Sequence, residues 1–332
     1  MQPYEQLEYE IGKWAGVEHV VACSSGTAAL HLALEALCLE SGSEVIVPDF
    51  TMVACPRAVT MAGLTPVFVD CGEDLLIDCD LVSRISDIEE IRAIMPVHIY
   101  GRRCDMDAII STANDVDWWV VEDMAEAHGI KPHPSSDAWA WSFYRNKIVA
   151  GEEGGAVAFR CKEHADLARQ LRSLGFTDAH DFMHVPRGCN YRLANSLAKP
   201  ILQSLRQFES TMMLRQKIRD MYDRLCPLEW MMPERDVPWV YDLRIRGLKN
   251  VDEGVKALND DGIAARHGFK PMSEQAEYGG RSGMKWFGGP DGVSVAKRMS
   301  REVFYLPIDP QHINERKIKQ SFETIKRVAR TT

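Results

Sequence analysis

The residues best suited to chemistry on a carbonyl group lie in three segments. Lys147 ends the run 142–147 (Ser-Phe-Tyr-Arg-Asn-Lys), just before a glycine-rich turn at residues 151–155. Asp123 lies upstream of it, and residues 24–29 (Ser-Ser-Gly-Thr-Ala-Ala) open an apolar segment. A lysine amine can form an imine with an aldehyde, a carboxylate can pair with a protonated pyridine nitrogen, and hydroxyls at a helix N-terminus can hold a phosphate. Together the three segments suit pyridoxal phosphate.

Each segment also has an ordinary structural interpretation. A lone lysine is most often a solvated surface charge, and residues 24–29 could be a plain helix cap. Asp123 follows an apolar strand, at whose C-terminal end ligands bind in open α/β sheets, but it could instead cap a helix that begins near Met124. Glu126 could complete a capping box or reach the same ligand. The combination of segments favours the cofactor site.

Aromatic and histidine side chains add one candidate and exclude one class of site. Phe50 follows Pro48 and offers a ring that could stack on a flat cofactor, although it could equally pack in the core. No histidine has the spacing of a metal-binding motif, so we expect no metal site; the histidines considered are His31, His98, His128 and His184.

Composition is that of a globular protein and argues against two classes of binding partner. Its 332 residues are 26% charged and 45% apolar, and the net charge of -9 argues against binding to nucleic acid or to an anionic membrane. The nine cysteines form no Cys-x-x-Cys pair, so we expect reduced thiols and a cytoplasmic location. The N-terminus lacks the apolar core of a signal peptide, and polar residues interrupt the longest apolar stretch, residues 20–39.

The pattern of apolar residues predicts an α/β fold with a mostly parallel sheet. Strands and helices alternate through the first half, which is typical of βαβ units, and an α+β pattern follows. We expect a large α/β domain at residues 1–200, a connecting helix at 201–229 and a smaller α+β domain at 230–332. The predicted strands lie at residues 19–23, 44–48, 65–70, 93–97, 118–122, 138–143, 156–159, 239–245 and 302–306. The predicted helices lie at residues 4–14, 27–39, 52–62, 105–114, 162–174, 193–225, 251–260 and 314–330.

In its motifs the chain resembles the DegT/StrS-type sugar aminotransferases, a pyridoxal-phosphate family of fold type I. The resemblance spans almost the whole chain, with the motifs in the same order. The sequence around Asn146 and Lys147 is most similar to that of the perosamine-synthase-like members. The matching runs are residues 25–34, 44–51, 62–70, 96–101, 105–107, 122–129, 142–147, 188–193, 269–272 and 306–307.

The resemblance implies a role for each candidate residue. Lys147 would form the Schiff base and shuttle the proton, Asp123 would pair with the pyridine nitrogen, and Phe50 would stack on the ring. Glu126 occupies the place near the ring hydroxyl where many members have Gln, and Asn190 would reach the phosphate in the neighbouring subunit, which implies a homodimer with shared active sites. The phosphate would be held by Gly26, Thr27 and Ser142, with Ser25 beside them.

The implied reaction is transamination through the pyridoxal and pyridoxamine forms of the cofactor. Glutamate would donate the amine, and the keto group of a nucleotide-linked deoxysugar, at the 4-position rather than the 3-position, would accept it. Some relatives are sugar dehydratases with His at the lysine position, and Lys147 argues against that reaction. A cyclic ketone such as an inosose could replace the nucleotide sugar as acceptor, and a catalytically inactive regulatory homologue would also be compatible with the fold.

Three departures from the family pattern concern the substrate pocket. Relatives usually carry a further stretch before the first matching helix, so one wall of the pocket could be supplied differently here. Glu152 stands where relatives have Gly, and Ser273 stands where many have His. We expect these differences to affect substrate recognition rather than cofactor binding.

Overall fold

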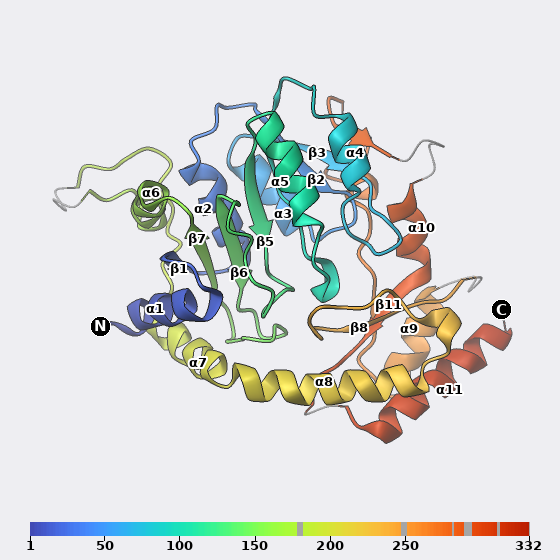
Figure 1. Cartoon of the computed structure of the whole chain (residues 1–332). Helices are drawn as coiled ribbons and strands as arrows, with labels where there is room; N and C mark the ends of the chain where they lie inside the picture. Colours follow the sequence, from blue (N-terminus) through green and yellow to red (C-terminus); the bar gives the residue numbers. More distant parts are fainter. Residues whose placement is uncertain (178–181, 247–250, 281, 289–293, 311–312, 332) are drawn as a thin grey trace.

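A large lobe and a smaller lobe make up the chain, joined along one side by a long helix (Figure 1). The computed structural model describes residues 1–177, 182–246, 251–280, 282–288, 294–310 and 313–331. Helix α7 (Asn195–Arg206) lies under the large lobe, and α8 (Phe208–Leu225) runs from there to the small lobe. Sequence alone predicts one helix over 193–225, but the chain divides it at Gln207, which ends α7 and precedes α8.

In the described part of the chain, the large lobe contains an eight-stranded sheet with the order β1-β7-β6-β5-β4-β2-β3-β10. Strand β7 is antiparallel to both its neighbours, and the remaining pairs are parallel, which confirms the predicted α/β class. The strands are β1 (His19–Cys23), β2 (Glu44–Pro48), β3 (Thr65–Val69), β4 (Ile91–Ile94), β5 (Trp119–Asp123), β6 (Ala138–Ser142), β7 (Gly155–Phe159) and β10 (Lys285–Phe287).

Apart from the edge strand β10, the strands of this sheet are rich in Val, Ile and Ala and are buried almost throughout, as expected for a sheet covered on both faces. Helix α2 packs on β5, β6 and β7, while α5 contacts β5 and α3 contacts β2 and β3. The helices of this lobe are α1 (Pro3–Ala15), α2 (Gly26–Ala36), α3 (Ala54–Met61), α4 (Cys79–Arg84), α5 (Met106–Asp115) and α6 (Lys162–Arg172), with the short η1 (Ile99–Gly101).

The small lobe has its own sheet and its own apolar core. Its antiparallel strands follow the order β8-β11-β9, with β8 (Tyr241–Arg244), β9 (Arg266–His267) and β11 (Val303–Leu306). Helices α9 (Val251–Asp260) and α11 (Glu315–Thr331) pack on each other, and α11 also packs on α8. Helix α10 (Val295–Glu302) leads directly into β11.

The C-terminal part of the chain does not stay in the small lobe. Strand β10 returns to the large sheet and pairs in parallel with β3, Trp286 lying opposite Phe68. Met272 and Tyr278 are buried in the core of the large lobe, so apolar surface that β3 would otherwise expose at the sheet edge is covered. The sequence predicts a single small domain at residues 230–332. Strand β10 is short, and its apolar pattern is too weak to reveal that the chain returns to the large lobe.

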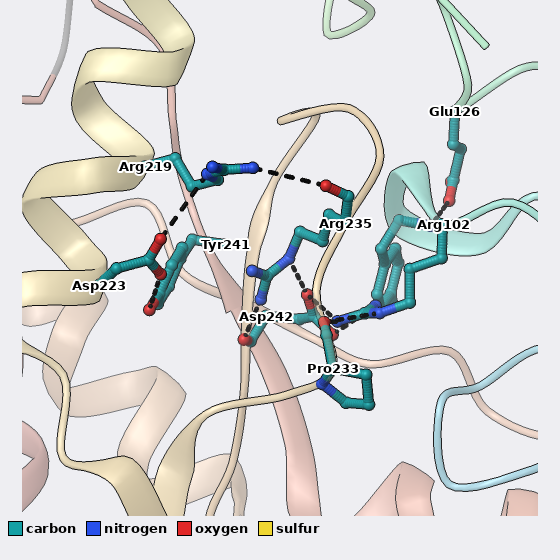
Figure 2. Close-up of polar contacts among 9 residues, drawn as sticks. Arg102, Glu126, Arg219, Asp223, Pro233, Arg235, Tyr241 and Asp242 are labelled. Atoms are coloured by element: carbon teal, nitrogen blue, oxygen red, sulfur yellow. Dashed lines mark hydrogen bonds and ion pairs between the residues drawn. The ribbon is translucent and has the colours of Figure 1, made fainter.

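A buried ionic cluster ties the lobes together next to the sheet's carboxyl edge (Figure 2). Asp242 on β8 is fully buried, and its carboxylate lies 2.9 Å from Arg102 Nη1 and 2.6 Å from Arg235 Nε. Burial opposes ionisation, but the two guanidinium groups outweigh it and lower the pKa of Asp242. Because Arg102 follows η1 of the large lobe, this cluster positions the small lobe against the ends of β4 and β5.

Candidate active site

A cavity of about 810 Å³ lies between the carboxyl ends of β5 and β6 and the small lobe. Ligands of open α/β sheets bind outside the carboxyl ends of the strands. The strands themselves are buried, so the sheet is accessible to a ligand at this edge. The large lobe supplies to its lining Ser25, Gly26, Thr27, Leu30, Met52, Ala54, Val97, Asp123, Ala125, Glu126, Ala140, Trp141, Ser142, Tyr144, Asn146, Lys147 and Glu153. The small lobe and the segments leading to it supply Trp239, Val255, Asn259, Ala265, Arg266, His267, Phe269 and Tyr305.

Lys147 lies in the turn that follows β6, and its amine points into the cavity wall rather than into solvent. The Lys147 N–H donates to the Tyr144 carbonyl at 2.8 Å, which fixes the turn. Its side chain is only 12% exposed, and Nζ lies 4.3 Å from the centre of the Trp239 ring. The Trp239 indole N–H donates to the Asn146 carbonyl at 3.0 Å and so clamps the same turn. The interpretation of Lys147 as a solvated surface lysine does not describe this side chain.

Asp123 is the last residue of β5 and is buried. Its Oδ1 accepts the Ala125 N–H at 2.8 Å, and its Oδ2 accepts the Cys55 thiol at 3.1 Å. The chain after β5 forms a turn and no helix begins near Met124, so the helix-cap interpretation of Asp123, and the capping-box interpretation of Glu126, are wrong. The carboxylate is therefore oriented from two sides and faces a cavity.

The loop between β1 and α2 forms the second polar end of the cavity. Ser25 is the N-cap of α2, and its hydroxyl accepts the Ala28 N–H at 3.1 Å. Gly26 packs so closely on Ser142 that an added Cβ would lie 2.6 Å from the Ser142 Cβ, which restricts this position to glycine. Thr27 lines the cavity in the first turn. Free N–H groups and a positive helix end at this place suit a phosphate.

Glu126 occupies the floor of the cavity beside Lys147. Its Oε2 accepts the Tyr100 N–H at 2.9 Å, and its Oε1 lies 3.8 Å from Lys147 Nζ. Tyr100 adopts a left-handed backbone conformation with φ 53°, a strained conformation for a non-glycine residue in the loop that presents this N–H. Burial raises the pKa of the Glu126 carboxyl to about 7, with the charge of Lys147 acting in the opposite direction.

Two of the expected site residues do not line this cavity. Phe50 is fully buried, with its ring 6.2 Å from that of Tyr100 and 5.8 Å from that of Phe269. It thus supports Phe269, which lines the cavity, while Met52, two residues later and half exposed, lies in the lining itself. Because neighbouring side chains cover the Phe50 ring, Phe50 does not offer a direct stacking contact to a ligand in the cavity.

Asn190 is exposed and lies outside the main cavity. It borders a second hollow of about 420 Å³, together with Tyr4, Arg172, Ser173, Arg192, Leu193, Ala194 and Asn195. The adjoining Tyr191 carbonyl accepts the Ser24 N–H at 2.8 Å, so this segment is tied to the loop before α2. Within one chain Asn190 therefore does not join Lys147 and Asp123.

The two residues expected to affect the substrate pocket lie outside its lining. Ser273 donates its hydroxyl to Asp49 at 2.8 Å, and its N–H donates to the same carboxylate at 2.7 Å. Neither Ser273 nor Glu152 belongs to the cavity lining, and Glu152 is exposed in the turn after Lys147. Ser273 thus holds buried Asp49 in the large lobe.

Sequence reasoning misses most of the wall supplied by the small lobe. Asn259, Arg266 and His267 all line the cavity, yet none lies within a motif that specifies chemistry. Trp239 has only its position as the first residue of a predicted strand as a signal. The one available hint is that Arg266 and His267 lie close before the run 269–272, which already shows the family resemblance.

The residues present fit pyridoxal phosphate. An enclosed amine, a buried carboxylate and a glycine-containing helix N-terminus converge on one cavity, and Gly26 leaves the space where a Cβ would collide with Ser142. Among the described residues, no group of three or more His, Cys, Asp or Glu side chains could hold a metal ion. Nor is any helix in the described ranges both long and apolar enough to cross a membrane.

Comparison with known proteins identifies the family. The model of the DegT/DnrJ/EryC1/StrS aminotransferase family matches residues 2–326. GDP-perosamine synthase of Caulobacter vibrioides is 34% identical over 289 residues, covering 82% of this chain and 78% of that protein. The dTDP-3-amino-3,4,6-trideoxy-alpha-D-glucose transaminase of Micromonospora megalomicea subsp. nigra is 31% identical over 331 residues, covering 93% of this chain and 85% of that protein.

A solved structure gives the same result for the fold. S. venezuelae DesV, in complex with a ketimine intermediate, superposes with a TM-score of 0.87 at 29% identity and covers 99% of this chain and 90% of that chain. The predicted fold type and the resemblance to perosamine-synthase-like sequences are both confirmed. The chain belongs to the DegT/DnrJ/EryC1/StrS aminotransferase family and is a pyridoxal-phosphate-dependent sugar aminotransferase.

Proposed function

We propose that this enzyme transfers an amino group from glutamate to the keto carbon of a nucleotide-linked deoxysugar, at the 4-position. The observation that carries the proposal is the convergence of Lys147, Asp123 and the N-terminus of α2 on one cavity. Lys147 retained at this position favours transamination over dehydration of the sugar, and the intact set of polar groups argues against an inactive regulator.

The residues of the chain divide the work by position. Pyridoxal phosphate, when bound, supplies an electron sink for a carbanion. Asp123, whose carboxylate is fixed by Ala125 and Cys55, would keep the ring nitrogen protonated by ion pairing. Lys147 would take a proton from one carbon atom and return it to another as general base and acid. Trp239, which covers its amine, limits access of water to that step.

The same cavity contains residues that would contact the phosphate and the ring hydroxyl of the cofactor. Ser25, Gly26, Thr27 and Ser142 would hold the phosphate at the N-terminus of α2, where free N–H groups and the helix dipole favour an anion. Glu126 would face the ring hydroxyl from the cavity floor. These contacts would hold the cofactor in the cavity that the Lys147 amine also lines.

The substrate assignment rests on the cavity and on the named relatives. The polar groups of Asn259, Arg266 and His267 lie on the small-lobe side, opposite the cofactor residues, where a polar and anionic substrate would enter. GDP-perosamine synthase and a dTDP-amino-sugar transaminase are both nucleotide-sugar enzymes by name. The second of these is named for a 3-amino product, so a 3-keto sugar is the second candidate.

The test follows the two halves of the reaction separately. Glutamate added to the cofactor-loaded enzyme should convert the pyridoxal form to the pyridoxamine form, which absorbance records. Nucleotide-linked 4-keto and 3-keto sugars, and an inosose, are then added in turn, and the product is analysed by mass spectrometry. We expect the 4-keto sugar to restore the pyridoxal form and gain nitrogen. Restoration by the inosose alone, or a product that loses water without gaining nitrogen, would reject the assignment.

We also propose a cytoplasmic homodimer with shared active sites. All nine cysteines are free, which fits a reducing compartment, and Asn190 stands exposed beside a hollow where a partner could dock. Inactive Lys147→Ala is mixed with inactive Asn190→Asp, which would repel the phosphate. If sites are shared, one site of each mixed dimer carries neither change and activity returns. No recovery after verified subunit exchange would contradict the shared site.

A further inference from the structure

Glu126 and Lys147 form an enclosed pair of opposite charge on the cavity floor. Glu126 Oε1 lies 3.8 Å from Lys147 Nζ, and the two side chains are only 7% and 12% exposed. Solvent screens such a pair far less than a surface pair, and the charge of Lys147 opposes the rise in the Glu126 pKa that burial causes. The separation exceeds a hydrogen bond, and a side-chain movement of about 1 Å would close it.

The remaining groups that face Glu126 do not neutralise it. Asp123 on β5 and Asp242 on β8 are acids, and both disfavour a second negative charge. Tyr305 on β11 and the Tyr100 phenol are neutral. Among the described residues, only the Tyr100 backbone N–H donates to the carboxylate.

The nearby guanidinium groups are already committed. Figure 2 shows Glu126 pointing toward the segment that carries Arg102, with Asp242 beyond it. Arg102 and Arg235 pair with Asp242 instead of with Glu126. Within the described part of the chain, Lys147 supplies the ion-pair contact of Glu126.

The charge of Glu126 changes near neutral pH, unlike that of the carboxyl group four residues earlier. Burial raises the pKa of Glu126 to about 7. Burial also opposes ionisation of Glu122, but hydrogen bonds led by His98 lower the pKa of that carboxyl below its ordinary value. Trp139 Nε1 also donates to Glu122, at 2.8 Å. The pKa values of these two buried glutamates therefore shift in opposite directions, because Glu122 is surrounded by hydrogen-bond donors and Glu126 is not.

We propose that Glu126 exchanges a proton with Lys147 during the reaction. An N–H bond of the Lys147 ammonium breaks and an O–H bond forms on Glu126 Oε1, giving a neutral amine and a carboxylic acid; the reverse step returns the proton. No proton enters or leaves solvent, so charge and atoms balance. The inference rests on the proposed function, in which Lys147 must be uncharged to act as a base.

The first experiment uses the cofactor-free full chain and needs no activity. Acetic anhydride labels neutral amines, and mass spectrometry gives the labelling rate of each lysine. The labelling rate of a solvent-exposed lysine amine falls about tenfold per pH unit below its pKa, and exposed Lys199 serves as the reference. For Lys147 it should fall less than about threefold between pH 8 and 7, because above the pKa of Glu126 the proton that leaves the ammonium stays on the carboxyl group and the fraction of neutral amine depends little on pH. In Glu126→Gln, Lys147 should follow the ordinary tenfold slope.

The second experiment measures the glutamate half-reaction of the loaded enzyme by stopped-flow absorbance. In the wild type the rate should change less than about threefold between pH 8 and 7, since the pair keeps its proton internally above the pKa of Glu126. In Glu126→Gln it should fall about tenfold over that range. The amide preserves the acceptor for Tyr100, and Glu126→Asp, which retains a titratable group farther from Nζ, should give an intermediate slope.

Controls separate this inference from the proposed function. Glu153→Gln removes the same charge from the edge of the cavity and should keep the shallow Lys147 slope. If the wild type does not react with glutamate, the proposed function fails, while the labelling slopes still report on the pair. If the wild type reacts but Lys147 labels with the same slope in wild type and Glu126→Gln, the proton exchange is overturned.

Discussion

The two walls of the cavity differ in how far their polar side chains are exposed. The large-lobe wall consists of strand ends and the turns that follow them, where Lys147, Asp123 and Ser25 each have a fixed partner. The small-lobe wall presents Arg266 on a two-residue strand, with an exposed side chain. Fixed groups suit chemistry that needs a defined geometry, whereas longer, exposed side chains suit recognition of varied substrates.

This difference indicates a division of labour that substitutions can test. Changes in the large-lobe wall should impair the reaction with every substrate. Changes in the small-lobe wall should act mainly on substrate binding and leave the cofactor in place.

The largest effect is expected for Lys147→Ala, which removes the amine from the large-lobe wall. Transamination should fall by about 10⁴-fold or more, because both the covalent attachment and the proton transfer are lost. Borohydride reduction of the wild type followed by peptide mapping should tag Lys147, and the variant should take up no tag. A tag on another lysine would place the chemistry outside this wall.

Asp123→Asn tests the second group of the same wall. An amide cannot hold the ring nitrogen protonated by ion pairing, so turnover should fall by about 10²-fold while the fold is retained. Circular dichroism and the glutamate half-reaction are measured together. Near-native turnover would mean that the buried carboxylate serves only the turn with Ala125.

Arg266→Ala tests the opposite wall. If its guanidinium binds an anionic part of a substrate, the KM for that substrate should rise by about 10-fold or more, the scale of a hydrogen bond to a charged group. Cofactor affinity and the spectrum of the loaded enzyme should stay as in the wild type. Arg266→Lys keeps the charge and serves as the matched variant. A fall in kcat with unchanged KM would contradict the division between walls.

Sequence alone predicts the large-lobe wall because local chemistry specifies it. The strand before Asp123, the cap before Thr27 and the turn at Lys147 each arise within a few residues, so pattern and resemblance reveal them. Their mutual placement follows from parallel strands that end at one edge. The stacking role expected for Phe50 depends on which side chain faces the cavity. Met52, two residues later, lines the cavity, and Phe50 does not.

The small-lobe wall depends on contacts between distant segments, which periodicity does not encode. Asp242 meets Arg102 across 140 positions, and β10 joins β3 although each strand alone gives only a short apolar run. Burial and charge in the folded state determine which of these segments contact each other. Position alone therefore could not assign Trp239 or Arg266 to the cavity.

The smallest effect is expected for Cys55→Ala, which removes a support behind the large-lobe wall. Burial, and then the charge of Asp123, raise the pKa of the Cys55 thiol well above its usual value, so the thiol stays protonated and donates to the carboxylate. Thiols are weak donors, and losing this bond should slow the glutamate half-reaction about fivefold, roughly the value of one modest hydrogen bond. Cys55→Ser keeps a donor of similar size and should stay within about twofold of the wild type. Equal rates in wild type and Cys55→Ala would show that the Ala125 N–H alone orients Asp123, and that the wall needs no support from α3.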